Sequence, residues 1–325
     1  MIMSRTPLRI SFVGGGTDIR EFYSKHGTGA VVSAAINKYI YVVINKKFDD
    51  QIRVSYSVTE IVDSVEKIKH PTVREALRLL GIKGGIEIVS ISDIPSSGTG
   101  LGSSSSFLVG LLNALHAFLG NYVSPRTLAE EAVKIEREIL GEPGGKQDQY
   151  MAAFGGLQLL EFHSDESVDV KPLIMDDQIR EEISNNLLLM YTGRQRKSTA
   201  IHEMQKASIS DHIEKYIKMS EMAREIQSIC ASRKPEMIGR TMHENWLLKK
   251  TLSEGITDPV IDSWYETAMK NGAVGGKLIG AGGGGFMLFY VEPENRQRVI
   301  DSLPDLRPVN FRFEYLGSRI IMVGD

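Results

Sequence analysis

The most specific chemical feature of the sequence is a run of glycines and serines at residues 95–106, with Gly98, Gly100 and Gly102 at alternate positions. Glycines at this spacing allow successive backbone N–H groups to turn toward one point, and the helical pattern that starts at Ser103 adds the positive end of a helix. Serine hydroxyls can add hydrogen bonds or ligate a magnesium ion. The segment is predicted to bind the phosphates of a nucleotide, and a flexible Gly/Ser turn is the alternative.

Two commoner phosphate-binding motifs are absent or out of context. The pattern G-x-x-x-x-G-K-S/T does not occur, because Lys146 is followed by Gln147 and Lys277 by Leu278. Residues 280–285 match G-x-G-x-x-G, but residues 286–291 have the pattern of a strand, whereas a dinucleotide-binding fold requires a helix there. A P-loop ATPase is therefore excluded, and a dinucleotide-binding fold has weak support.

Three carboxylates stand where they could act on a substrate or an ion. Asp18 follows a glycine cluster at the end of a strand pattern, where it could accept two hydrogen bonds from sugar hydroxyls. Asp148 lies in a glycine-rich loop after a helix and is a candidate base for a hydroxyl nucleophile. Glu136 lies in an apolar helical row and needs a cation or a donor. A solvated turn at Asp18 and a salt bridge at Glu136 are the alternatives.

A second anion site is predicted at residues 191–198. Arg194, Arg196 and Lys197 follow a strand-like apolar run and precede a helix. Such a junction offers guanidinium groups and helix N-terminal amides to one phosphate. A solvated charge run that caps the helix is the alternative.

The elements that must position these residues alternate between strands and helices. The helix after the glycine run is predicted over residues 103–119, and Ser124 and Pro125 begin a second one that runs to about residue 140. A polar acidic stretch near residues 174–182 suggests a boundary between two units. Further helices are predicted at 197–208, 211–231, 235–252, 259–271 and 294–303, and strands at 8–13, 39–45, 51–56, 86–91, 276–279, 286–291 and 309–315. This order favours an α+β class.

Composition narrows the range of partners. A chain of 325 residues favours two domains, and 38 basic against 41 acidic residues give no field that would recruit nucleic acid or an anionic membrane. No apolar stretch approaches the ~20 residues of a membrane helix, so a cytoplasmic protein is expected. Cys230 is the only cysteine, which excludes internal disulfides and thiolate metal clusters. The composition does not decide whether the protein forms a homo-oligomer.

The chain resembles the GHMP kinases, a family that includes galactokinase, homoserine kinase and mevalonate kinase. Residues 7–18, 95–106 and 280–285 look like the three motifs of the family in their proper order, and the resemblance runs from end to end. It implies an α+β fold with a ribosomal protein S5 domain 2-like N-terminal domain at residues 1–178, which binds ATP and sugar. A ferredoxin-like C-terminal domain at 179–325 would follow, with the active site between the two.

The resemblance also implies a role for individual residues, with ATP and Mg²⁺ as cofactors. Asp148 matches the catalytic carboxylate and Arg9 the catalytic basic residue, and Ser104 and Glu136 match the magnesium ligands. The residues that would bind ATP are Gly98, Thr99, Gly100, Leu101, Gly102, Ser103, Ser104 and Ser105. The residues that would bind substrate are Gly15, Gly16, Thr17, Asp18, Gly282 and Gly283, together with the basic residues at 194, 196 and 197.

Within the family, the variant of the first motif and the loop at residues 144–150 look most like the kinases of D-glycero-D-manno-heptose 7-phosphate. Those enzymes phosphorylate the anomeric hydroxyl to give the 1,7-bisphosphate, so the expected partners are ATP and a small sugar phosphate. Galactokinases have Gly-Glu-His-Thr-Asp where this chain has three glycines before Thr17 and Asp18, which argues against galactose. Another sugar 1-kinase, fucokinase- or galactokinase-like, and a catalytically silent nucleotide-binding relative are the alternatives. Arg9, Ser104, Glu136 and Asp148 together argue against the silent relative.

Overall fold

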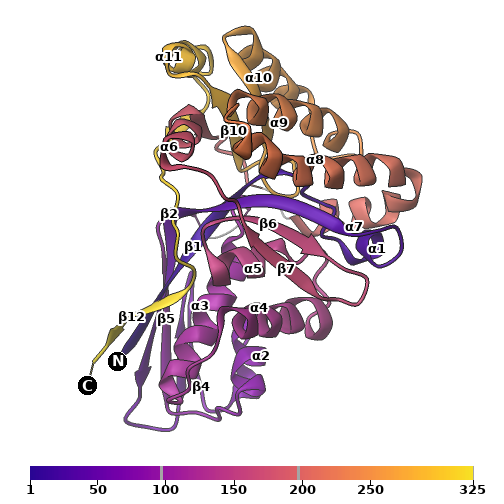
Figure 1. Ribbon diagram of the computed structural model, residues 1–325. Coiled ribbons are helices and arrows are strands. Elements are labelled where there is room, and N and C mark those ends of the chain that lie inside the picture. Colours follow the sequence, from indigo (N-terminus) through magenta and orange to yellow (C-terminus); the bar gives the residue numbers. More distant parts are fainter. Residues whose placement is uncertain (96–97, 196–197, 325) are drawn as a thin grey trace.

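The computed structural model describes residues 1–95, 98–195 and 198–324, and it contains two β-sheets with helices packed on them. The larger sheet and its helices occupy the lower part of Figure 1, and the smaller sheet lies above with α8 to α11. In the described part of the chain, none of the helices combines the length and apolar character needed to cross a membrane.

The larger sheet has eight strands. Six follow the order β12-β1-β2-β5-β3-β4, β6 pairs with the first half of β2, and β7 pairs with β6. Helices α3 and α5 pack on β1 and β2, and α2 and α4 pack beside them. The strands are β1 (Ile2–Val13), β2 (Gly29–Lys46), β3 (Ile52–Ser55), β4 (Thr59–Val62), β5 (Ile86–Ser92), β6 (Leu157–Phe162), β7 (Val168–Pro172) and β12 (Arg319–Val323). The helices are α1 (Arg20–Tyr23), α2 (Pro71–Leu79), α3 (Ser103–Phe118), α4 (Pro125–Val133) and α5 (Gln147–Phe154).

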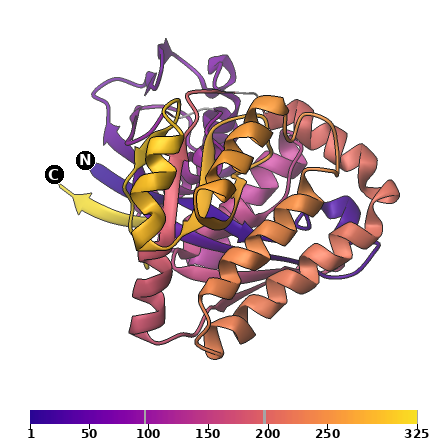
Figure 2. The same cartoon turned by 90° about the horizontal axis from the view of Figure 1, so that it is seen from above.

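The smaller sheet is antiparallel, with the order β11-β8-β10-β9. Its central strand β10 is buried at every position, as its unbroken apolar sequence requires. The strands are β8 (Leu187–Tyr191), β9 (Ala273–Leu278), β10 (Phe286–Val291) and β11 (Arg307–Val309). The helices are α6 (Asp177–Asn186), α7 (Ser198–Ser208), α8 (Ile213–Ala231), α9 (Glu236–Lys249), α10 (Pro259–Lys270) and α11 (Pro293–Ser302). Figure 2 shows α8 and α9 side by side above the larger sheet.

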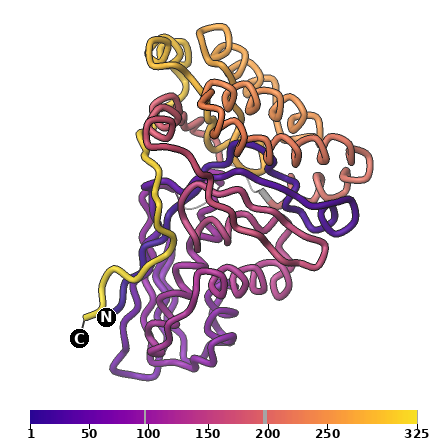
Figure 3. Tube along the Cα trace, viewed as in Figure 1, coloured from indigo at the N-terminus to yellow at the C-terminus, as the bar shows by residue number. Residues whose placement is uncertain are grey.

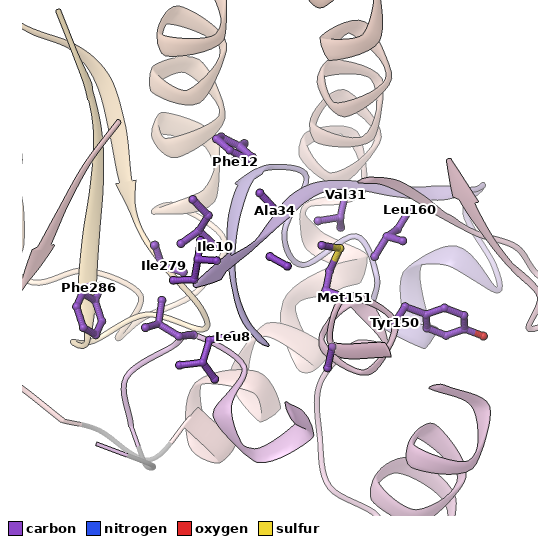
Figure 4. Close-up of a cluster of buried hydrophobic side chains, with 14 of the residues drawn as sticks. Leu8, Ile10, Phe12, Val31, Ala34, Tyr150, Met151, Leu160, Ile279 and Phe286 are labelled. Atoms are coloured by element: carbon purple, nitrogen blue, oxygen red, sulfur yellow. The ribbon is translucent and has the colours of Figure 1, made fainter. Parts of the chain in front are cut away.

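An apolar contact joins the two sheets. Figure 4 places Leu8 and Ile10 of β1 next to Ile279, which follows β9, while Met151 of α5 lies farther along. These four residues are fully buried. The first eight residues of β2 are also buried, because α5 packs on the strand and α8 packs on it from the smaller-sheet side. The catalytic candidates on β1 and α5 are thus held on a rigid, doubly covered part of the sheet.

The predicted strand at residues 309–315 is wrong beyond Val309. The chain leaves β11, residues 312–314 hydrogen-bond with residues 35–37 of β2, and β12 pairs antiparallel with β1, so the two termini lie side by side (Figure 3). Apolar residues alternate at Phe311 and Phe313 although this segment is not a strand of the smaller sheet. Phe313 packs edge-on against Phe12 of β1. The division into residues 1–178 and 179–325 stays a prediction; residue 178 lies inside α6.

Other differences are local. The loop predicted at residues 144–149 is helical from Gln147, where α5 begins. The helix expected to run to residue 140 changes after Val133 to a π-helical segment, Lys134–Ile139. The polar stretch near residues 174–182 enters α6, where Asp176 caps the helix by accepting a hydrogen bond from the Ile179 N–H. The acidic first turn of α6 therefore resembles a linker in its composition.

Helix α9 packs on β9 through two glycines, and we expect Gly275→Ala to destabilise the protein. A Cβ on Gly275 would stand 1.9 Å from the carbonyl oxygen of Gly239, so α9 would have to move off the sheet. Overpacking of this kind costs about 1–3 kcal/mol. Thermal unfolding should show a lower Tm, whereas Gly324→Ala, where a Cβ meets nothing within 4 Å, should not change it. An unchanged Tm for Gly275→Ala would contradict this packing.

Candidate active site

Two glycine loops from distant parts of the sequence lie main chain against main chain. A Cβ on Gly100 would stand 2.4 Å from the carbonyl oxygen of Ile279, and a Cβ on Gly280 would stand 2.6 Å from the Cα of Gly100. A Cβ on Gly285 would stand 2.2 Å from the carbonyl oxygen of Thr99. Gly100 also has a φ of 76°, in the left-handed region. Glycine is therefore required at these positions, both for the close contact and for the backbone conformation.

The paired loops border a cavity of about 700 Å³, a size suited to a nucleotide. Helix α3 begins at Ser103, so its first N–H groups and its positive end belong to the same site. Of the eight residues predicted to bind ATP, the six that line the cavity are Gly98, Thr99, Gly100, Gly102, Ser103 and Ser104. The other two lie behind it: Leu101 is fully buried, and the Ser105 hydroxyl donates to Glu136.

Arg9 and Asp148 form the ion pair at the centre of the site. Two nitrogens of the guanidinium, 2.8 and 2.6 Å away, contact the same oxygen of Asp148, and the third donates to the carbonyl of Gly100. The side chain of Arg9 is 5% exposed and that of Asp148 is 23% exposed, so the carboxylate faces the open side. Both residues line the cavity. Arg9 thereby ties the glycine loop to the carboxylate that was predicted to be catalytic.

Asp18 lies in a second, smaller cavity of about 50 Å³ that also contains Arg9 and Asp148. Its carboxylate accepts hydrogen bonds from the backbone N–H groups of Gly16, at 3.0 Å, and Gln147, at 3.2 Å. Gly145 must be glycine, because a Cβ there would stand 1.8 Å from the Asp18 carboxylate. The structure therefore brings together the first glycine cluster and the loop that carries Asp148.

The remaining residues predicted to bind substrate lie at different depths. Gly16 lines the small cavity and Gly282 the large one. Thr17 is fully buried, and its hydroxyl exchanges hydrogen bonds with the backbone of Ala30. Gly283 is buried and its N–H donates to Ile256. Gly15 lies against the ammonium groups of two buried lysines.

Glu136 is buried, as its place in the apolar row predicted. Its carboxylate accepts hydrogen bonds from Ser105 and Gln149, and Arg137 lies 3.6 Å away. Burial raises the pKa of this carboxyl above its ordinary value, although Arg137 and Ser105 act in the opposite direction. Ser104, the other predicted magnesium ligand, is exposed at the mouth of the large cavity. Glu136 thus bonds to Ser105 rather than to Ser104.

The predicted second anion site is only partly described. Arg194 directs its guanidinium to Asp258, with contacts of 3.2 and 2.6 Å, and Asp258 also caps α10. This pair fastens the loop after β8 to α10. Arg196 and Lys197 lie outside the described residues.

Helices α7 and α9 supply the small cavity with polar residues that were not predicted from the sequence. They are His202, Gln205 and Lys249. Gln205 is 1% exposed, and its amide nitrogen has no partner among the described residues. Burial lowers the pKa of His202 to about 4, so the ring is neutral at physiological pH. The sequence does contain one indication of a role for Gln205. It is a polar residue spaced four positions from each of two buried apolar residues, Ile201 and Ile209, just as Glu136 lies in an apolar helical row.

Comparison with known proteins agrees with this geometry. Residues 61–156 match the family described as GHMP kinases N terminal domain, and residues 222–307 match the one described as GHMP kinases C terminal. A relative from Campylobacter jejuni, named D-glycero-alpha-D-manno-heptose 7-phosphate kinase, is 32% identical over 93% of this chain and 93% of its own length. The chain belongs to the GHMP kinase family. It is a phosphotransferase that uses an alcohol group as acceptor, and the predicted fold class is confirmed.

Two further proteins show which members of the family this GHMP kinase resembles. A crystal structure of a D-glycero-D-manno-heptose 1-phosphate kinase from Bacteroides thetaiotaomicron superposes with a TM-score of 0.83 at 25% identity, and all of both chains are covered. A bifunctional L-fucokinase/L-fucose-1-P guanylyltransferase from Bacteroides fragilis is 25% identical over 95% of this chain but only 36% of its own length. These relatives group the chain with the sugar kinases of the family.

The contact between the two glycine loops predicts that Gly100→Ala weakens ATP binding. The new methyl group would meet the carbonyl of Ile279 and would also impose a left-handed backbone on alanine, which alone costs about 1–2 kcal/mol. Gly120→Ala is the matched control, because its φ of 77° is the same while a Cβ there meets nothing within 4 Å. Titration with a fluorescent ATP analogue should give a Kd at least about tenfold higher for Gly100→Ala than for the control. Equal affinities would contradict the role of the contact.

Proposed function

We propose that this GHMP kinase is an ATP-dependent sugar kinase that phosphorylates the anomeric hydroxyl of D-glycero-D-manno-heptose 7-phosphate to the 1,7-bisphosphate. The observation that supports it most is the adjacency of the two cavities. The large one has the glycine loops and the start of α3, the small one has Asp18, and the Arg9–Asp148 pair belongs to both. The similarity to heptose phosphate kinases supports the choice of sugar. A cytoplasmic location, where ATP is available, is part of the proposal.

In this proposal the large cavity takes ATP, and the acceptor binds with its reacting end at the small cavity, beside Asp18 and Asp148. Backbone N–H groups of residues 98–104 hold the phosphates, and Arg9 neutralises charge on the transferred group. Asp18 accepts hydrogen bonds from sugar hydroxyls, with Gly15, Gly16, Thr17, Gly282 and Gly283 shaping the surroundings. Asp148 orients the anomeric hydroxyl and accepts its proton as the oxygen bonds to the γ-phosphorus and the bond to the β–γ bridging oxygen breaks. The products are the sugar 1-phosphate ester and ADP.

The donor chemistry fits Mg²⁺, which prefers oxygen ligands and commonly combines one or two carboxylates with substrate phosphates. Within the described residues no group of three or more acidic, histidine or cysteine side chains could hold a metal by itself. Ser104 at the cavity mouth and Glu136 behind it would hold the ion together with the nucleotide. When bound, the ion neutralises phosphate charge. Ser105 and Gln149 fix the orientation of the Glu136 carboxylate.

The proposal is tested by a coupled ADP-release assay with a panel of acceptors. The panel contains heptose 7-phosphate, heptose 1-phosphate, the unphosphorylated heptose, fucose, galactose, mevalonate and homoserine. Both heptose phosphates are included because the names of the relatives put the phosphate at different positions. We expect the highest kcat/KM with heptose 7-phosphate. A clear preference for fucose or galactose would favour another sugar 1-kinase, and no turnover with any acceptor would favour a silent relative.

Asp148→Asn is expected to lose most turnover while it still binds ATP. The change removes the charge that would receive the hydroxyl proton, and general-base catalysis contributes about 10²- to 10⁴-fold in rate. The glycine loops that border the nucleotide cavity are unaltered, so the Kd for ATP should change little. The two quantities are measured by steady-state kinetics and by ATP titration. Turnover within about threefold of the wild type would remove Asp148 from the catalytic role.

Glu136→Gln is expected to raise the Mg²⁺ concentration needed for activity and, separately, to stabilise the fold. Because burial raises the pKa of Glu136, the charged form is disfavoured in the folded state, and the wild type loses stability as pH rises through that pKa. The variant avoids this loss, so its advantage in Tm should widen as pH increases above the ordinary carboxyl value of 4.5. Exposed Glu138→Gln is the control. An unchanged magnesium titration would favour the salt bridge to Arg137 as the only role of Glu136.

A further inference from the structure

Two lysines are buried beside the small cavity. Lys249, the last residue of α9, is 4% exposed, and Lys277 of β9 is 0% exposed. Their ammonium nitrogens lie 3.4 and 3.7 Å from the point where a Cβ on Gly15 would stand, so both converge on the first glycine cluster. The contact of α9 with β9 through Gly239 and Gly275 holds them in this arrangement.

Neither ammonium group makes a salt bridge with a carboxylate of the described residues. Lys249 donates to the carbonyl of Gly280 at 2.9 Å, and Lys277 donates to the Ser11 hydroxyl at 3.1 Å. Each ammonium has three N–H donors, so each has donors that these contacts leave unused. A buried ammonium without a counter-ion is costly, and such charges are normally paired. The two lysines therefore offer unused N–H donors to an anionic ligand.

The position of Lys249 indicates where such an anion would bind. Lys249 lines the small cavity with Asp18, and it is not among the residues that line the nucleotide cavity. Two other cations line the small cavity, and both have partners. Arg9 is bonded to Asp148 and Gly100, and Arg137 donates to the carbonyls of Glu142, Pro143 and Gly145. Among the described residues that line the small cavity, Lys249 is thus the cation with unused N–H donors.

We propose that Lys249, supported by the charge of Lys277, forms the subsite for the phosphate that the acceptor already has. This inference rests on the proposed function, because it assigns a place to the acceptor's own phosphate monoester. A dianion between the two lysines would favour their ammonium forms, and the unused N–H donors would bind its oxygens. The sequence placed this subsite at residues 194, 196 and 197 instead. The guanidinium of Arg194 is bonded to Asp258, whereas Lys249 has donors available.

The charges around Lys249 agree with an anion site. The pKa of Lys249 is lowered to about 8, mainly by burial and also by Arg9, while Asp18 and Asp148 act in the opposite direction. Burial and the nearby charges of Lys249 and Arg9 also lower the pKa of Lys277 well below its usual range, against the influence of Asp18. A bound phosphate favours the ammonium form. The kcat/KM for a phosphorylated acceptor should therefore fall above about pH 8, more steeply than that for the unphosphorylated sugar.

The test compares heptose 7-phosphate with the same heptose without phosphate. The quantity of interest is the ratio of the two kcat/KM values in the wild type and in Lys249→Met, which replaces the ammonium with an apolar group of similar length. We expect the ratio to fall at least about tenfold in Lys249→Met, through a higher KM for the phosphorylated acceptor. The value for the unphosphorylated heptose should stay within about threefold. Unchanged ATP affinity and Tm establish that the variant is folded.

Two further variants sharpen the result. Lys250→Met removes the neighbouring ammonium, which is bonded to Asp262 at 3.2 Å, and should leave the ratio unchanged. Arg196→Ala tests the segment that the sequence favoured, and a fall in the ratio there but not in Lys249→Met would overturn the proposal. Equal losses with both acceptors in Lys249→Met would also overturn it, since the lysine would then act at the reacting group. A high wild-type ratio that Lys249→Met leaves unchanged contradicts the subsite alone. A wild-type ratio at or below one contradicts the proposed function and the subsite with it.

Discussion

The backbone contact between the loops at residues 98–102 and 280–285 is the constraint on which the rest of the site depends. Each loop comes from a different part of the chain, and each needs glycine because the other main chain occupies the place of a Cβ. The contact forms a wall of the large cavity next to the start of α3. Arg9 then links the first loop to Asp148, so that the proposed phosphate site and the proposed catalytic carboxylate have a fixed relation. Such preorganisation is the main way in which an enzyme promotes phosphoryl transfer.

The second theme is burial of charge near the site. Burial disfavours the charged forms of Glu136, Lys249 and Lys277, so each has a shifted pKa that costs stability at neutral pH. Asp18, 3% exposed, is held by backbone N–H groups. Groups of this kind are arranged for a partner that is not part of the protein. In the proposed function, the carboxylate oxygens of this site would bind magnesium and sugar hydroxyls, and its ammonium groups would bind phosphate.

The parts of the site that contain glycine clusters could be predicted from the sequence. Glycine allows backbone conformations and close approaches that other residues do not, and this can be inferred without knowledge of the fold. The sequence also predicted β10 at residues 286–291, where an unbroken apolar run has few alternatives. It could not predict Lys249, because the importance of this residue depends on the packing of α9 over the first glycine cluster. The strand at residues 309–315 was predicted wrongly because alternation indicates that one side is buried but does not identify the partner. Residues 312–314 hydrogen-bond with β2, and Phe313 packs against Phe12 of β1. The roles of the site residues remain predictions.

The central claim is that the two cavities align the γ-phosphoryl group of ATP with the anomeric hydroxyl of a sugar phosphate. Its most direct test is a phosphorus and proton NMR spectrum of the product made from ATP and heptose 7-phosphate. The account predicts a second phosphomonoester signal that is coupled to the anomeric proton, with the original 7-phosphate signal retained. A product signal coupled to a proton at another carbon, or ADP formation without a new sugar phosphate, would contradict it.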